Sequence, residues 1–163
     1  MILFSCALEL EESNINIMNN LIIDAATNKI FLTVINNKNI YTSSYENSKS
    51  NFEKLVILIN EFLENNKISI NEIEKIYVNR GPGSFAGIRN SLSIVKGFYL
   101  SKNIDYFCFS FLDFIILDSD LKKKITDNSS LLNKFHNIKY EDVPNLCDKF
   151  KIKKNLIKPL YLS

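Results

Sequence analysis

All four glycines of this 163-residue chain lie between positions 81 and 97. Three of them, together with both arginines of the chain, fall in the run Arg80-Gly81-Pro82-Gly83-Ser84-Phe85-Ala86-Gly87-Ile88-Arg89. The sequence is otherwise rich in Ile, Asn and Lys, and a codon bias of that kind would thin glycine evenly along the chain. Glycine reaches backbone conformations and close approaches that other residues do not. This segment is therefore where we expect the fold to be most tightly constrained.

Short apolar or β-branched runs, separated by turn residues, predict five strands. These runs occupy residues 21–23, 30–35, 40–45, 76–78 and 106–109. The first three are close enough in sequence to form an antiparallel meander. A capping box of Ser69 and Glu72 comes before the fourth run and predicts a short helical turn there.

Two long helices are predicted between the later strands. Apolar residues recur at three- and four-residue spacing over 50–66, where Ser50 and Glu53 resemble a capping box. A second helix is predicted over 84–101, directly after the glycine segment, and a third begins at Ser110. The resulting order, βββαβα and then a strand, predicts an α/β fold in which helices flank a mixed β-sheet.

Composition and charge narrow the classes of protein to which the chain can belong. Apolar residues make up 46% of it and charged residues 23%, values typical of a folded globular domain. The net charge is +2, which is too small for a protein that binds nucleic acid through electrostatic attraction alone. The apolar runs are too short to span a membrane. We expect residues 1–17 to be a disordered extension ahead of a natural start at Met18. The odd number of cysteines, in no CxxC spacing, indicates a reducing cytoplasm: Cys6, Cys108 and Cys147.

The glycine segment admits two interpretations. Ser84 is placed to cap the following helix, whose N-terminal amide groups form a natural anion site. On this interpretation the segment would bind phosphate. The spacing GxGxxxG, however, differs from the dinucleotide fingerprint, and the Lys-Ser/Thr ending of a P-loop is missing. A tight strand-to-helix turn with close packing is an equally good interpretation.

The apolar stripes of the two long helices offer more hydrophobic surface than one sheet layer needs. Such stripes are usually core, and any part left exposed would form a partner surface. Gly97 and Ser91 are small enough to let another helix approach. We predict a partner interface on these residues: Phe52, Leu55, Val56, Ile59, Phe62, Leu63, Phe85, Ile88, Leu92, Val95 and Tyr99.

The segment GPGSFAGIR, with a strand before it and SLSIVKG after it, closely resembles the GPGSFTGIR signature of the TsaB family. The run Asp24-Ala25-Ala26-Thr27 is similar to that family's DTST. The closing Pro159-Leu160-Tyr161-Leu162 resembles its terminal P-x-Y-L. The likeness covers residues 18–117 well and the tail weakly.

The resemblance implies an actin-like ATPase fold of the sugar-kinase and chaperone superfamily. It further implies a scaffold subunit that pairs with TsaD, the catalytic paralogue, through the two long helices. In that complex TsaD transfers threonylcarbamoyl to a tRNA adenosine beside the anticodon, and TsaE supplies an ATPase. Residues 18–117 would be the first lobe and 118–163 a shortened second lobe. Contact with tRNA is expected to be indirect, and no membrane is involved.

Several departures from the family pattern bear on chemistry. The resemblance implies a phosphate-facing site made by Asp24, Thr27 and the glycine segment. Ala25, Ala26 and Ala86 stand where the family has hydroxyl residues, so at most a vestigial phosphate or ATP site is expected, with no cofactor, no metal and no catalytic residue. The single histidine, His136, cannot recreate the paired histidines that hold a metal in the catalytic relative. The alternatives are a nucleotide-binding actin-like ATPase or kinase acting alone, a peptidase, and a homodimeric scaffold built on the same helices.

The two arginines at the glycine segment have two open interpretations. Lysine meets most basic needs of this chain, so retention of Arg80 and Arg89 indicates that the planar guanidinium fork is used. Arg89 either holds the loop by bonding nearby acceptors or contacts a partner across the interface.

Overall fold

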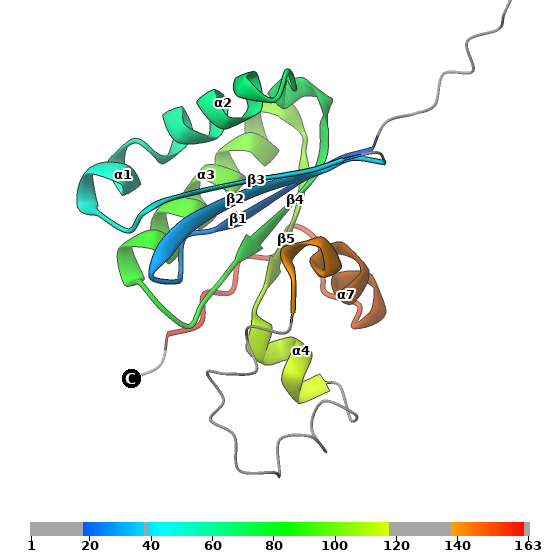
Figure 1. Ribbon diagram of the computed structural model, residues 1–163. Coiled ribbons are helices and arrows are strands. Elements are labelled where there is room, and N and C mark those ends of the chain that lie inside the picture. The colour runs from blue at the N-terminus through cyan, green and yellow to red at the C-terminus, as the bar shows by residue number, and fades with distance from the viewer. Residues whose placement is uncertain (1–17, 38, 118–137, 162–163) are drawn as a thin grey trace, which may run out of the picture.

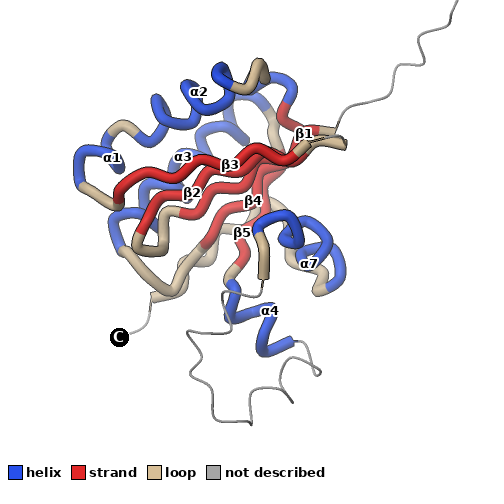
Figure 2. Tube along the Cα trace, viewed as in Figure 1, coloured by secondary structure: helices blue, strands red, loops and turns tan. Residues whose placement is uncertain are grey.

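The computed structural model describes residues 18–37, 39–117 and 138–161. Its centre is a five-stranded sheet of order β3-β2-β1-β4-β5, in which β2 is antiparallel to β1 and β3, while β4 and β5 run parallel to β1 (Figure 1; Figure 2). This confirms the predicted meander and mixed sheet. The strands are β1 Asn19–Asp24, β2 Lys29–Ile35, β3 Ile40–Glu46, β4 Ile73–Asn79 and β5 Asp105–Phe109.

Helices cover both faces of the sheet. One face carries α1, α2 and α3, and the other carries α4 and α7 (Figure 1). Two short 3-10 turns, η1 and η2, precede β4 and α7. The bounds are α1 Lys49–Glu53, α2 Leu55–Asn65, η1 Ile70–Glu72, α3 Phe85–Lys102, α4 Phe111–Leu117, η2 Tyr140–Asp142 and α7 Val143–Lys149.

The helix starts agree with the sequence at two places and differ at a third. The capping box of Ser69 and Glu72 is present, and Ser84 caps α3 by accepting a hydrogen bond from the Gly87 N–H. The prediction that Ser50 caps the first helix is wrong, because Ser48 is the N-cap and accepts from the Asn51 N–H at 3.2 Å. The single helix predicted over 50–66 is also divided in two at Lys54.

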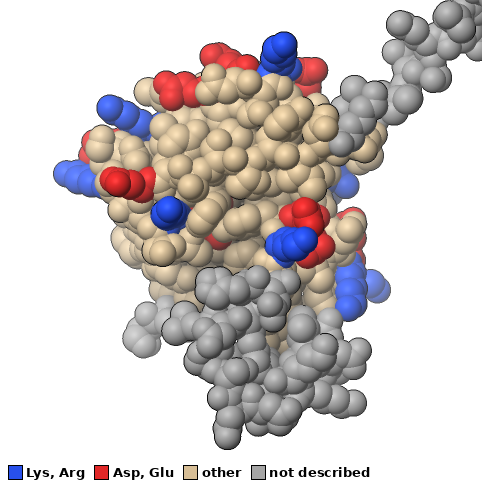
Figure 3. Space-filling model, in the orientation of Figure 1, with Lys and Arg blue, Asp and Glu red and all other residues tan. Residues whose placement is uncertain are grey.

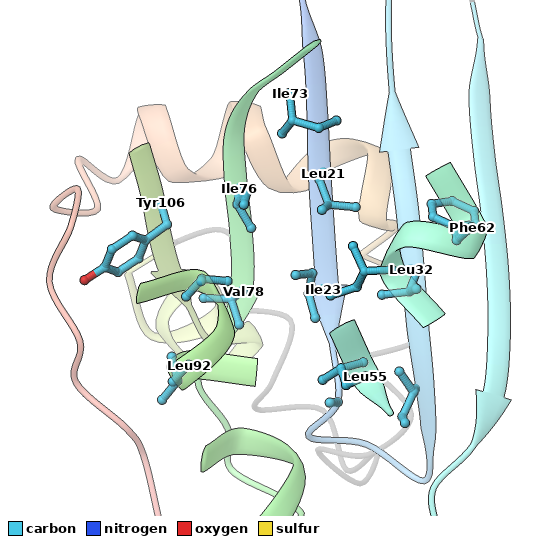
Figure 4. Packing of buried hydrophobic residues seen from close by; sticks show 14 of the residues in the cluster. Leu21, Ile23, Leu32, Leu55, Phe62, Ile73, Ile76, Val78, Leu92 and Tyr106 are labelled. Atoms are coloured by element: carbon cyan, nitrogen blue, oxygen red, sulfur yellow. The ribbon is translucent and has the colours of Figure 1, made fainter. Parts of the chain in front are cut away.

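Side chains alternate between the two faces of the sheet and form two cores. Leu21, Ile23 and Leu32 point toward α2 and α3, where they meet Leu55 and Leu92 (Figure 4). The second core lies on the opposite face, around α4 and α7. Its buried members are Ile22, Tyr77, Phe109, Phe114, Val143 and Cys147.

The predicted helix stripes belong to the first core, and this corrects most of the predicted partner interface. Eight of its residues are buried against the sheet, so their side chains are not available to a partner: Phe52, Leu55, Ile59, Phe62, Leu63, Ile88, Leu92 and Val95. Val56 and Phe85 are exposed and Tyr99 is half-buried. For these three residues a partner contact stays a prediction.

The C-terminal segment closes one edge of the sheet. Lys154 forms an isolated antiparallel bridge with Phe107 of β5, and the Asn155 N–H donates to the Tyr106 carbonyl at 2.7 Å. The Asn155 side chain accepts from the Tyr106 N–H at 2.9 Å. Residues 138–161 thus pack on the same sheet as the residues before 118, and the division into a first and a shortened second lobe stays a prediction. The predicted extension 1–17 lies outside the described residues.

Candidate functional site

The carboxyl ends of the parallel strands β1 and β4 bring Asp24 and Asn79 together. Asp24 is fully buried and its carboxylate accepts three hydrogen bonds. The donors are the Ala26 N–H at 3.0 Å, Asn79 Nδ2 at 2.9 Å and the Tyr140 hydroxyl at 2.8 Å. Asn79 also accepts from the Gly81 N–H at 3.0 Å, which links the cluster to the glycine segment. Protein groups therefore occupy the acceptors that a phosphate-site or metal-site carboxylate would offer to a ligand.

Electrostatics at Asp24 are dominated by its removal from water. Burial raises the pKa of the Asp24 carboxyl above its ordinary value, although the hydrogen bonds from Asn79, Tyr140 and the backbone act in the opposite direction. Burial, and then the neighbouring Asp24 charge, also raises the pKa of Tyr140. The phenol therefore keeps its proton and remains a donor to the carboxylate.

The raised pKa makes a testable contribution to the pH dependence of stability. A group whose pKa is raised on folding stabilises the fold below its unfolded-state pKa, here about 3.8, and loses that contribution as the pH rises through the folded-state value. We expect the free energy of unfolding of the wild type, relative to Asp24→Asn, to be largest in acid and to decline toward neutral pH. Each tenfold change in proton affinity contributes about 1.4 kcal/mol.

Urea titrations of both proteins from pH 3 to pH 7 measure this difference. Other carboxyls have the opposite pH dependence; hydrogen bonds from Asn155 and Lys154, for example, lower the pKa of Asp105. Because both proteins contain these carboxyls, their contributions cancel in the difference between the two free energies of unfolding. A difference that grows toward neutral pH would mean that the three donors outweigh burial.

The glycine segment packs against the loop that follows β1. A Cβ atom added to Gly83 would lie 1.9 Å from the Ala26 carbonyl oxygen, and one added to Gly87 would lie 1.8 Å from the Ala25 carbonyl oxygen. The Ser84 N–H donates to the same Ala26 carbonyl at 2.8 Å. This backbone contact consumes a donor that an anion site would need, and it favours the interpretation of the segment as a tight strand-to-helix turn. The Gly81–Pro82 peptide bond is cis.

The Arg80 side chain binds two parts of the chain, Asp113 in α4 and the C-terminal segment at Lys158. Its Nη2 and Nε atoms bind the Asp113 carboxylate at 2.7 and 3.1 Å, a two-point contact that only the guanidinium fork can make. Its Nη1 donates to the Lys158 carbonyl at 3.0 Å, and its own carbonyl accepts from the Leu160 N–H at 2.8 Å. Arg80 thereby ties the end of β4 to α4 and to the C-terminal segment.

The other predicted loop residues are not drawn into the Asp24 cluster. The Thr27 hydroxyl donates to the Lys29 carbonyl at 2.9 Å, which turns it back on its own loop. The Arg89 side chain is exposed and forms no ion pair or hydrogen bond with any residue that the structure describes. No contact in that part of the chain supports the loop-holding interpretation, and a partner contact stays a prediction. His136 lies outside the described residues, and the described part of the chain holds no group of three potential metal ligands.

Two residues of the cluster were missed from the sequence. Asn79 carried a usable signal, since it is a polar residue at the end of an apolar strand, directly before the glycine segment. Tyr140 carried none, because it is 116 positions from Asp24 and lies in a segment with no strong pattern.

The outward faces of the long helices remain free of core contacts. Val56 and Ile57 are exposed on α2, and Leu100 is 73% exposed on α3. Gly97 lies on the outer side of α3, where an added Cβ would meet no atom within 4 Å. At the start of α3 the rings of Phe85 and Tyr161 contact each other in a tilted arrangement, with centroids 5.0 Å apart, beside Pro82 and Gly83.

The strand order, the crossover helix α3 and the carboxylate at the end of β1 define an actin-like α/β protein. A family model described as TsaD: tRNA N6-adenosine threonylcarbamoyltransferase matches residues 39–131. The chain belongs to this family, in its TsaB branch. No helix in the described part of the chain is long and apolar enough to cross a membrane.

Curated relatives and solved structures agree with this assignment. The chain is similar to two proteins described as tRNA threonylcarbamoyladenosine biosynthesis protein TsaB. The one from Buchnera aphidicola subsp. Baizongia pistaciae is 35% identical to this chain over 71 residues. The one from Buchnera aphidicola subsp. Schizaphis graminum is 32% identical to it over 95 residues. They are matched over 38% and 58% of this chain but only 32% and 45% of their own lengths, so the chain spans less than half of either. YeaZ from Pseudomonas aeruginosa shares the fold, with a TM-score of 0.55, 17% identity, and coverage of 61% of this chain and 46% of that one.

Proposed function

We propose that this chain is a non-catalytic subunit that dimerises with TsaD. In this role it supports threonylcarbamoyl transfer onto the tRNA adenosine beside the anticodon. The two Buchnera relatives, which are tRNA threonylcarbamoyladenosine biosynthesis proteins, support the pathway. The hydrogen bonds at Asp24 support the non-catalytic role, because the buried carboxylate is already bound by Asn79, Tyr140 and the Ala26 N–H.

The observation that carries the proposal is the outer face of α3 around Gly97. Ser93 and Ser101 lie one turn to either side of it and are also exposed. Each serine hydroxyl donates back to its own helix, Ser93 to the Arg89 carbonyl and Ser101 to the Gly97 carbonyl, both at 2.8 Å. The face is therefore small, and its hydroxyl donors are already used, so a partner helix can approach closely without burying an unpaired donor. Exposed Leu100 borders it with apolar surface.

Placing a large side chain at Gly97 tests this face. We expect Gly97→Leu to fold normally, because an added Cβ meets no atom within 4 Å, and to lower TsaD affinity by about tenfold or more, since it holds the two helices apart. Asn145→Leu, on exposed α7 across the sheet, is the matched control and should bind TsaD as the wild type does. Copurification with TsaD, and the threonylcarbamoyladenosine content of tRNA in cells that carry each variant as the sole copy, measure the effect.

The two readouts separate failure of the interface from failure of the function. Wild-type affinity for TsaD in Gly97→Leu would remove this face from the interface. An unchanged content of the modified nucleoside after deletion of the gene would contradict the function itself.

A further inference from the structure

The basic residues of the chain are concentrated in two stretches. Residues 85–102 and 149–161 hold eight of its twenty lysines and arginines and none of its eighteen acidic residues. The rest of the chain is therefore acidic on balance, and the net charge of +2 conceals a separation of charge. The β2–β3 side of the sheet, by contrast, shows few charges, and these are of both signs (Figure 3). Clustered basic charge is typical of a surface that binds a polyanion.

The fold places the two basic stretches side by side. The Tyr106 hydroxyl on β5 donates to the Asn155 carbonyl at 2.9 Å, and the Tyr106 ring contacts that of Tyr99 on α3, with centroids 5.9 Å apart (Figure 4). At the other end of α3, the Tyr161 ring contacts that of Phe85. The C-terminal segment therefore runs alongside α3, in the opposite direction to the helix.

One side of α3 faces the C-terminal segment and carries basic residues. At 3.6 residues per turn, a narrow arc of this helix holds four side chains: Phe85, Arg89, Lys96 and Tyr99. The two aromatic rings of this arc mark the side next to the C-terminal segment, so the two basic residues lie on that side as well. Gly97 points about 100° away from Lys96 around the helix. The side next to the C-terminal segment is thus adjacent to the α3 face proposed for TsaD and distinct from it.

Four cations along this side have no acidic partner. Arg89, Lys153 and Lys158 are exposed, and the Lys96 ammonium lies 4.9 Å from the centre of a tyrosine ring. None of the four forms an ion pair with a residue in the described ranges. Lys154 is different, because its ammonium lies 3.0 Å from a carboxylate of β5. Together the four unpaired cations form the basic strip.

An exposed aromatic pair lies at one end of the basic strip. Phe85 is 59% exposed and Tyr161 is 45% exposed, and with Pro82 and Gly83 they line an open hollow at the start of α3. Proteins that bind single-stranded nucleic acid combine cations along the backbone with aromatic rings on which bases stack. A membrane surface is typically bound by an amphipathic helix, and the exposed part of the C-terminal segment is not helical.

We propose that the basic strip binds the phosphate backbone of a single-stranded stretch of RNA, while one base stacks against Phe85 and Tyr161. The choice of tRNA as that RNA rests on the proposed function. A direct contact differs from the indirect one that the family resemblance implied. Because the basic strip borders the α3 face proposed for TsaD, one RNA can contact both proteins. Four phosphate contacts predict a slope of log affinity against log salt concentration of about −3.

Neutralising two lysines tests the basic strip. Lys153→Gln combined with Lys158→Gln should weaken binding of the full chain to an unmodified tRNA transcript by about tenfold or more in about 0.1 M salt, where each phosphate contact contributes about fivefold. The salt slope should become shallower by about 1.4. Lys29→Gln combined with Lys54→Gln removes the same charge from exposed positions elsewhere and should bind as the wild type does. Fluorescence anisotropy over a series of KCl concentrations measures both pairs.

Removing one ring tests the stacked base. Tyr161→Ala should weaken tRNA binding by about tenfold and leave the salt slope unchanged, because stacking involves no phosphate. Tyr161→Phe keeps the ring and should bind like the wild type. Duplex DNA, whose bases are stacked inside the helix, should bind about tenfold or more weakly than tRNA.

Other outcomes would overturn the proposal. An equal loss of affinity in the Lys29 and Lys54 control would mean that binding follows net charge alone. Absence of tRNA binding by the wild type, or equal affinity for duplex DNA, would exclude a site for single-stranded RNA. Stronger binding to phosphatidylserine vesicles than to tRNA would assign the basic strip to a membrane. The Lys153 and Lys158 variant should still copurify with TsaD, so failure of the basic strip is distinguishable from failure of the proposed function.

Discussion

Val95→Lys is expected to destabilise the chain strongly. Val95 lies on the inner side of α3, is completely buried and belongs to the first core. A lysine there would place an unpaired charge in an apolar interior, a change that costs about 3–5 kcal/mol. Domains of this size have a total stability of about 5–15 kcal/mol, so the variant would lose a large part of its free energy of unfolding. Urea denaturation followed by far-UV circular dichroism measures the loss.

The matched control is Val56→Lys on α2. Val56 is 42% exposed, so its replacement should change the free energy of unfolding by no more than about 0.5 kcal/mol. The opposite pattern, a stable Val95→Lys protein that has lost only TsaD binding, would restore the buried stripe as a contact surface. The pair thus tests directly which side of the helices is available to a partner.

The inner stripes show what periodicity does and does not predict. The spacing of apolar residues correctly identified one face of each long helix. It could not say whether the sheet or a second protein covers that face, because both present the same apolar surface to the helix. The exposed face of α3, with Gly97 between two serines, carries little apolar signal and was for that reason harder to find.

Local signals predicted the fold well. Short apolar runs at β1 and β2 and the turn residues between them predict the meander, and the Ser69–Glu72 and Ser84 caps depend only on neighbouring residues. The Ser50 cap failed because Ser48, two residues earlier, offers the same chemistry in the extended conformation that a cap requires.

The site depends on contacts that sequence spacing does not encode. Asp24 was recognised as a candidate residue, but its environment is made by Asn79 and Tyr140, which come from β4 and from η2. Alanines in place of the family's hydroxyl residues were expected to weaken a phosphate site. The structure adds that the tyrosine hydroxyl and the asparagine amide already bind the carboxylate. The contacts of Asn79 and Tyr140 with Asp24 depend on how the strands and helices are arranged in space. A single sequence predicts that arrangement only approximately.

Gly87→Ala is expected to destabilise the chain by about 3 kcal/mol, toward the upper end of what inserting a methyl group into a packed interior costs. The added Cβ would lie 1.8 Å from the Ala25 carbonyl oxygen and 3.0 Å from a ring carbon of Phe52. The first neighbour is backbone held by the β1–β2 connection, so neither side can yield without moving α3 from the sheet. Thermal unfolding of the variant should show a clearly lower midpoint.

Gly97→Ala makes the comparison decisive because the same substitution occurs in the same helix. No atom lies within 4 Å of the added Cβ there, and alanine is the better helix former, so stability should rise by up to about 1 kcal/mol. Opposite signs at the two positions would mean that Gly87 is required for close packing between the turn and β1, while Gly97 serves something outside the monomer. If both variants were destabilised alike, helix α3 would have to pack differently from the arrangement described, and the surface proposed for TsaD would lose its basis.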